Sequence, residues 1–128
     1  MTRLIIMKNL RSKVSEKDIQ KAILAFLWKM GYPAFPVPNS GFFNPATRRY
    51  NIVDMSNHVK GVPDIVCPCP GGKTVYFEVK SETGCLSSEQ IEYHTILRTK
   101  NHNIAVVRSV NEVIMSLTNW GLCGATRI

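Results

Sequence analysis

The first regular pattern in the chain is a run of apolar residues at helical spacing that begins after Ser15. Ser15 is followed by the acidic residues Glu16 and Asp18, an arrangement typical of a helix start with a capping residue and acids in its first turn. Apolar residues then recur every three or four positions until Gly31: Ile19, Ala22, Ile23, Phe26, Leu27 and Met30. The pattern predicts an amphipathic helix whose apolar stripe needs a sheet or another helix to cover it.

Short apolar segments follow, separated by Pro and Gly. Three prolines between residues 32 and 41 predict an irregular connection. Strands are predicted at 47–54, 62–68, 73–80 and 103–108, and helices at 87–100 and 111–118. The resulting order, αβββαβα, is typical of an α/β fold in which helices flank a mixed sheet.

The segments 62–68 and 73–80 predict a β-hairpin, because the residues between them include Pro70, Gly71 and Gly72. The side-chain period of two in a strand places Glu78 and Lys80 together on one face of the second segment, opposite its apolar face. If the turn centres on Gly71, Asp64 lies opposite Glu78 on the neighbouring strand. We therefore expect Asp64, Glu78 and Lys80 to lie side by side.

Two carboxylates at cross-strand distance repel each other unless a cation lies between them. Mg²⁺ or Mn²⁺ suits such a site, since hard divalent ions take oxygen ligands and keep open positions for a phosphate. A lysine beside the ion can orient a bound water or neutralise developing charge, which is the chemistry of phosphodiester hydrolysis. The alternative is a solvated polar face that carries a Glu-x-Lys pair. The matching register of Pro63 and Asp64 favours the metal site.

The composition is that of an ordinary globular protein, with 45% hydrophobic and 20% charged residues in 128 positions. This length predicts a single domain, and no apolar run approaches the roughly 20 residues of a membrane span. The apolar opening, residues 4–7, is too short for the core of a signal peptide. We therefore expect a cytoplasmic protein without a membrane partner.

The formal net charge of +7 attracts polyanions. The basic residues are spread over the chain instead of lining one amphipathic helix, so nucleic acid is a better partner than a membrane surface. Alternatively, the charge only keeps the protein soluble. The candidate DNA-binding residues are Arg48, Arg49, Lys60, Lys73, Arg98 and Lys100.

The four cysteines contain no CxxC pair, so zinc is a poorer explanation than buried thiols. The hairpin register sends Cys67 and Cys69 toward the apolar face. His58 and His94 are candidate general bases, but a metal-activated water needs no histidine. We expect surface or packing roles for both histidines.

Three segments, residues 61–66 (GVPDIV), 77–80 (FEVK) and 86–90 (LSSEQ), together resemble the VRR-Nuc branch of the PD-(D/E)xK nucleases. The resemblance extends from Glu16 to about Val107. It implies a restriction-endonuclease-like fold and a single nuclease domain over residues 1–128. Residues 1–14 would then be a basic arm that either contacts DNA or forms a disordered tail.

The resemblance also implies roles for residues. Asp64, Glu78 and the backbone carbonyl of Val79 would bind Mg²⁺ or Mn²⁺, and Lys80 would assist the water. Gln90 would project from its helix toward the same site. Glu16 matches an acid that the family places on its first helix, as a catalytic residue and a further metal ligand. Local motifs also explain two of these residues: Glu16 as a first-turn acid, and Gln90 as part of a capping box with Ser87.

Stand-alone members of this family act as homodimers on branched DNA such as four-way junctions, whereas members within large eukaryotic proteins act as monomers on flaps. We therefore expect a homodimeric, metal-dependent, structure-selective endodeoxyribonuclease from a bacterium or phage, resolving Holliday junctions in DNA repair and recombination. The alternatives are a non-catalytic DNA-binding module of the same fold and a sequence-specific restriction-type nuclease.

Overall fold

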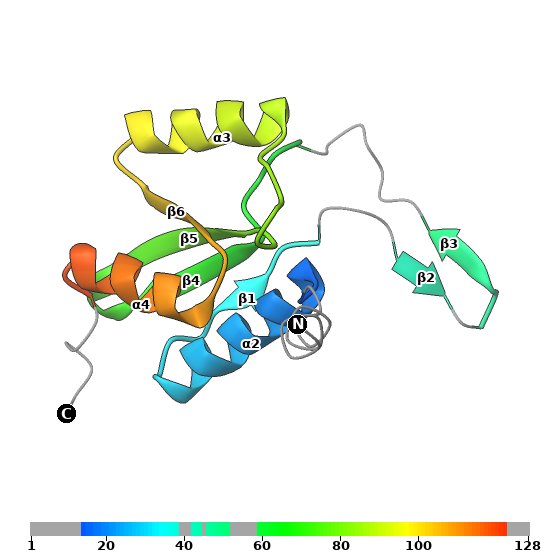
Figure 1. The fold of residues 1–128 in the computed structure, drawn as a ribbon, viewed down its shortest axis with the longest axis horizontal. Helices are drawn as coiled ribbons and strands as arrows, with labels where there is room; N and C mark the ends of the chain where they lie inside the picture. Colours follow the sequence, from blue (N-terminus) through cyan, green and yellow to red (C-terminus); the bar gives the residue numbers. More distant parts are fainter. Residues whose placement is uncertain (1–13, 39–41, 45, 52–58, 123–128) are drawn as a thin grey trace, which may run out of the picture.

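The computed structural model describes residues 14–38, 42–44, 46–51 and 59–122 (Figure 1). Its helices are α2 (Glu16–Lys29), α3 (Ser88–Thr99) and α4 (Val110–Asn119). Its strands are β1 (Phe35–Pro36), β2 (Phe42–Asn44), β3 (Arg49–Asn51), β4 (Ile65–Cys69), β5 (Lys73–Val79) and β6 (Asn103–Val107), with the 3-10 turn η2 (Pro70–Gly72) between β4 and β5. The proposed basic arm lies outside the described residues, except for Val14.

The main sheet has four strands in the order β1-β4-β5-β6. The pairs β1/β4 and β4/β5 are antiparallel and the pair β5/β6 is parallel, so the sheet is mixed. Helix α3 covers one face of the sheet, and α2 and α4 lie on the other (Figure 1). This arrangement confirms the predicted α/β fold with helices on a mixed sheet.

Two predictions for the segment between α2 and β4 were wrong. Residues 32–41 are not wholly irregular, because Phe35 and Pro36 form β1 on the outer edge of β4. The described part of the predicted strand 47–54 does not join the main sheet, since β3 pairs with β2 in a separate hairpin that projects from the body (Figure 1), and residues 52–54 lie outside the described residues. A two-residue strand that contains proline is too short for a period-two pattern, and its edge position tolerates the missing N–H.

The core lies between the sheet and the helices α2 and α4. Ile23 and Leu27 of α2 are fully buried, as the helical pattern predicts. Phe77 of β5 is also fully buried and lies near Trp120, with 5.8 Å between the ring centroids. The predicted stripe is wrong at Ala22, which is exposed at the edge of the buried surface. No helix within the described residues combines the length and apolar character that a membrane crossing requires.

The hairpin has the register that the sequence predicts. Ile65 pairs with Phe77, and Cys69 pairs with Lys73 at the turn end. Gly71 and Gly72 both have positive φ angles, 76° and 72°, in the turn between the strands, a conformation that glycine adopts without steric cost. Asp64 directly precedes Ile65, so the same register brings it level with Glu78.

Gly61 fixes the approach of the chain to this hairpin. Its φ is +83°, and a Cβ built there would lie 2.2 Å from the carbonyl oxygen of Glu89, in the first turn of α3. Two backbones can come this close only if one residue has no side chain. The segment that leads into Asp64 is thereby held against the start of α3.

We expect Gly61→Ala to lower the free energy of unfolding by more than about 2 kcal/mol, because it adds a clash with rigid backbone to the strain of a positive φ. Gly71→Ala is the matched control, since Gly71 has a similar φ but nothing within 4 Å of the added Cβ. It should cost about 1 kcal/mol. Urea denaturation of both variants measures the difference. Equal losses of unfolding free energy would show that the close approach to Glu89 does not add to the cost of the substitution.

Candidate active site

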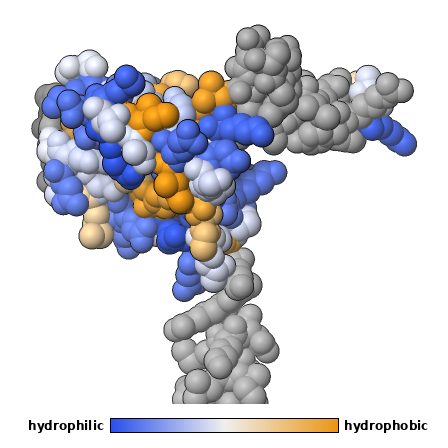
Figure 2. All heavy atoms as spheres, turned by 90° about the horizontal axis from the view of Figure 1, so that it is seen from above, coloured by the Kyte–Doolittle hydropathy of each residue, from blue (hydrophilic) through white to orange (hydrophobic). Residues whose placement is uncertain are grey.

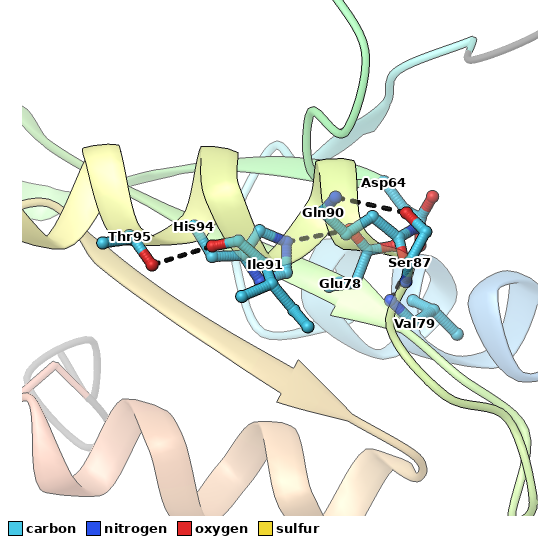
Figure 3. A network of polar contacts seen from close by, with 8 residues as sticks. All are labelled: Asp64, Glu78, Val79, Ser87, Gln90, Ile91, His94 and Thr95. Carbon is cyan, nitrogen blue, oxygen red and sulfur yellow. Dashed lines mark hydrogen bonds and ion pairs between the residues drawn. The ribbon is translucent and has the colours of Figure 1, made fainter.

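The candidate site lies where β4 begins and β5 ends, under the first turns of α3 (Figure 3). The side chain of Glu78 leaves β5 on the face opposite Phe77 and points toward α3. It is 1% exposed, whereas Asp64 is half-buried. The site therefore contains one acid that water hardly reaches and a second acid at its rim.

Asp64 and Glu78 lie together, as the hairpin register predicts. The Oδ2 atom of Asp64 accepts a hydrogen bond from the backbone N–H of Val79 at 2.8 Å, which ties it to β5. Its carboxyl group also shares a side-chain hydrogen bond with Glu78. Asp64 directly precedes β4 and Glu78 lies in the antiparallel strand β5, so the two acids face the same space.

Helix α3 supplies two polar contacts to Glu78. The Nε2 amide of Gln90 donates to Oε2 of Glu78 at 3.2 Å, and Nε2 of His94 lies 3.1 Å from Oε1 (Figure 3). Gln90 and His94 are one helical turn apart, so both point from one side of α3 to the same residue of β5. Each carboxylate oxygen of Glu78 therefore has its own partner.

The capping box of α3 determines how Gln90 is oriented. The side-chain Oε1 of Gln90 accepts the backbone N–H of Ser87 at 2.9 Å, while the Ser87 hydroxyl accepts the backbone N–H of Gln90. With Oε1 occupied, the amide NH₂ group is left to face Glu78. The capping role and the position in the site are therefore compatible, and Gln90 has both.

The pKa of Glu78 is raised to about 9, first by burial and then by the hydrogen bond and the negative charge of Asp64. The charge of Lys80 acts in the opposite direction, and that of Glu16 adds a small upward contribution. In the metal-free protein Glu78 therefore keeps its proton at neutral pH. In the unfolded chain Glu78 would be ionised there, so its burial costs stability increasingly as the pH rises from the ordinary pKa toward 9.

His94 is a site contact that sequence reasoning missed. It was expected to pack or to lie at the surface, and it is indeed fully buried, but it also contacts Glu78. Burial lowers its pKa, and the charge of Arg98 lowers it further. The imidazole is therefore neutral, and its contact with Glu78 is a hydrogen bond and not an ion pair. The available signal was its spacing of four residues from Gln90. His58 lies outside the described residues.

Glu16 and Lys80 lie around this pair. Glu16 is exposed in the first turn of α2, and its carboxylate lies next to Gly84, where an added Cβ would be 3.1 Å from Oε2. Lys80 directly follows β5, and its backbone N–H donates to Val107 at 3.1 Å. Both charges reach Glu78 electrostatically, although Glu16 makes no direct hydrogen bond to it among the described contacts.

Arg108, at the end of β6, fixes the turn that follows Lys80. Its Nη1 atom donates to the carbonyl oxygens of Ser81 and Gly84, the latter at 2.8 Å. Its own backbone N–H is accepted by the carboxylate of Glu112 in α4. The turn between β5 and α3 is therefore attached to the C-terminal end of the parallel strand pair β5/β6. The sequence contained no local signal for this role.

The candidate DNA-binding residues lie at separate places. Lys60 is exposed beside the start of α3, close enough for its charge to act on Glu89, and Lys73 is exposed at the turn end of β5. Arg98 and Lys100 are exposed at the end of α3. Arg48 is exposed between β2 and β3, and the side chain of Arg49 lies outside the described part of the structure.

The oxygen ligands at the site suit a hard divalent cation. Asp64 and Glu78 could supply carboxylates, and the carbonyl of Val79 would be the backbone ligand that the family resemblance implies. Within the described residues, no group of three His, Cys, Asp or Glu side chains could hold a metal, so backbone and water oxygens would complete the shell. A thiolate site at Cys67 is disfavoured, because burial raises the pKa of that thiol to about 12.

Comparisons with known proteins show which solved structure has a similar fold. No protein-family model matches the sequence, and the curated proteins contain no match. A solved structure described as a VRR_NUC domain is similar with a TM-score of 0.57, over 83% of this chain and 97% of the other, with 20% of residues identical. At this identity the likeness concerns the fold alone. The chain therefore has the restriction-endonuclease-like α/β fold of a VRR_NUC domain.

Proposed function

We propose that this protein is a metal-dependent endodeoxyribonuclease that hydrolyses phosphodiester bonds in branched DNA. The observation that carries the proposal is the pair formed by Asp64, directly before β4, and Glu78 in β5 of a nuclease-type fold, where the charge of Lys80 acts on Glu78. Two acids this close repel each other when both are ionised, and a divalent cation removes that cost. The positive net charge of +7 supports a polyanionic substrate.

In this proposal Asp64, Glu78 and the Val79 carbonyl would hold Mg²⁺ or Mn²⁺. Such an ion would polarise the scissile phosphate and lower the pKa of a bound water. Gln90 holds the carboxylate of Glu78 in place, and the ammonium group of Lys80 neutralises negative charge that develops on the phosphate. Glu16, at the start of α2, would be a further ligand of the ion and a further catalytic acid of the site.

The proposal also includes selectivity for branched DNA such as Holliday junctions, and a homodimeric state. They are supported by the resemblance of the three sequence segments to stand-alone VRR-Nuc enzymes. A junction has two strands to cut, so two copies of the site would be needed. A molar mass from light scattering equal to twice that of one chain is the expected result, and a monomer at working concentration would contradict this part.

Asp64→Asn and Glu78→Gln should each lower the Mg²⁺-dependent cleavage rate by about a hundredfold or more, because each removes a charged ligand. Binding of the same DNA in EDTA should be retained, since phosphate contacts come from elsewhere on the surface. Glu92→Gln is the matched control, because Glu92 is an exposed acid of α3 away from the pair. Labelled four-way junction, flap and linear duplex are the substrates.

Three outcomes of this assay would contradict the proposal. Cleavage that EDTA does not affect would show that the reaction needs no metal ion. DNA binding by the wild type without cleavage would indicate a non-catalytic module of the same fold. Cleavage of linear duplex at fixed sequences, with no preference for branches, would indicate a restriction-type nuclease.

Metal-free wild-type protein should lose stability relative to Glu78→Gln as the pH rises from about 5 to about 9. Within this range the unfolded chain releases the Glu78 proton while the folded protein, whose Glu78 has a pKa of about 9, retains it. Urea denaturation in EDTA at several pH values measures the difference. Equal pH dependence in both proteins would show that Glu78 is not held in a protonated, buried state.

A further inference from the structure

We propose that His94 is a positioning residue for Glu78, and that its hydrogen bond sets the affinity of the Asp64 and Glu78 pair for a divalent cation. The inference rests on the proposed function, which assigns the cation to these two acids. It adds a residue of α3 that contacts neither the cation nor DNA in the proposal. His94 would act only through the carboxylate that it contacts.

The contact is built into the interior of the protein. His94 is 0% exposed and Glu78 is 1% exposed, so water does not compete for the hydrogen bond between them. Gln90 already occupies Oε2 of Glu78, and Oε1 has His94 as its partner. Without His94, Oε1 would be a buried acceptor with no donor from α3, and Gln90 and Asp64 alone would hold the carboxyl group.

The tautomer of His94 follows from its surroundings. The Nδ1 atom is buried and has no hydrogen-bond partner within the described part of the chain. A buried N–H group without an acceptor is rarer than an unpaired acceptor. The proton of the neutral imidazole is therefore assigned to Nε2, which makes His94 a donor to Oε1 of Glu78.

A hydrogen-bond donor at Oε1 favours the ionised form of Glu78, which is the form that binds a cation. Hydrogen bonds from Gln90 and His94 stabilise the ionised carboxylate and leave each oxygen a second lone pair. Partners of this kind orient metal-binding carboxylates, and their loss typically costs about tenfold to a hundredfold in metal affinity. His94 and Gln90 would thus hold the acid in its binding orientation before the ion arrives.

The test compares substitutions that differ in the donor. His94→Phe keeps a planar ring in the buried space but removes the N–H. His94→Gln places an amide nitrogen near the position of Nε2, whereas His94→Asn is one carbon too short and places it near Nδ1. His102→Phe is the control, because His102 is exposed and packs edge-on against Tyr76. Circular dichroism checks that each variant is folded.

Binding of Mn²⁺ alone, followed by the electron paramagnetic resonance signal of the free ion, is the main measurement. We expect His94→Phe and His94→Asn to raise the Kd for Mn²⁺ by about tenfold or more. His94→Gln should stay within about threefold of the wild type, and His102→Phe should equal it. DNA cleavage by His94→Phe should recover toward the wild-type rate at high Mn²⁺. If His94→Phe does not fold, the Gln and Asn variants still give the comparison.

Several results would overturn the inference. Wild-type affinity in His94→Phe, in a protein that still cleaves DNA, would refute the role of His94 and leave the proposed function standing. Equal losses in the Gln, Asn and Phe variants would show that shape matters and not the donor. Nitrogen chemical shifts that place the proton on Nδ1 would refute the assigned tautomer. A wild type that binds no Mn²⁺ would refute both the proposed function and this inference.

Discussion

The register of the hairpin β4–β5 is the constraint on which the site depends. Side chains alternate between the two faces of a strand, so a slip of one residue would carry Glu78 into the apolar core and bring Phe77 under α3. The turn prevents this slip, because Gly71 and Gly72 adopt the positive φ angles that it requires. The burial of Phe77 on the opposite face also favours this register, since a shifted register would take Phe77 out of the apolar core.

Placing an acid in the interior normally costs stability, and helix α3 offsets part of that cost. Gln90 and His94 give each oxygen of Glu78 a partner, and Gly61 lets the backbone before Asp64 approach α3 closely. Lys80, which directly follows β5, contributes positive charge. The site is therefore a joint product of two strands and one helix, and none of these elements forms it alone.

The sequence predicted those features that depend on local periodicity. The register of the hairpin, the position of Asp64 beside Glu78 and the capping box of Gln90 all follow from turn residues and short spacings. Strand β1 was missed because two residues are too few to show an alternating pattern. Strand β3 was assigned to the wrong sheet because an alternating pattern does not tell with which strand a segment pairs. The role of His94 depends on which side of α3 meets β5, and that is decided by tertiary packing.

The double role of Gln90 has a consequence for the order in which the site is completed. The amide that closes the start of α3 is also a donor to Glu78, so fraying of that first helical turn withdraws support from the acid at the same moment. During synthesis on the ribosome the hairpin emerges before α3. At that stage the hairpin already carries both carboxyl groups, but Glu78 gains its donors Gln90 and His94 only when α3 has formed.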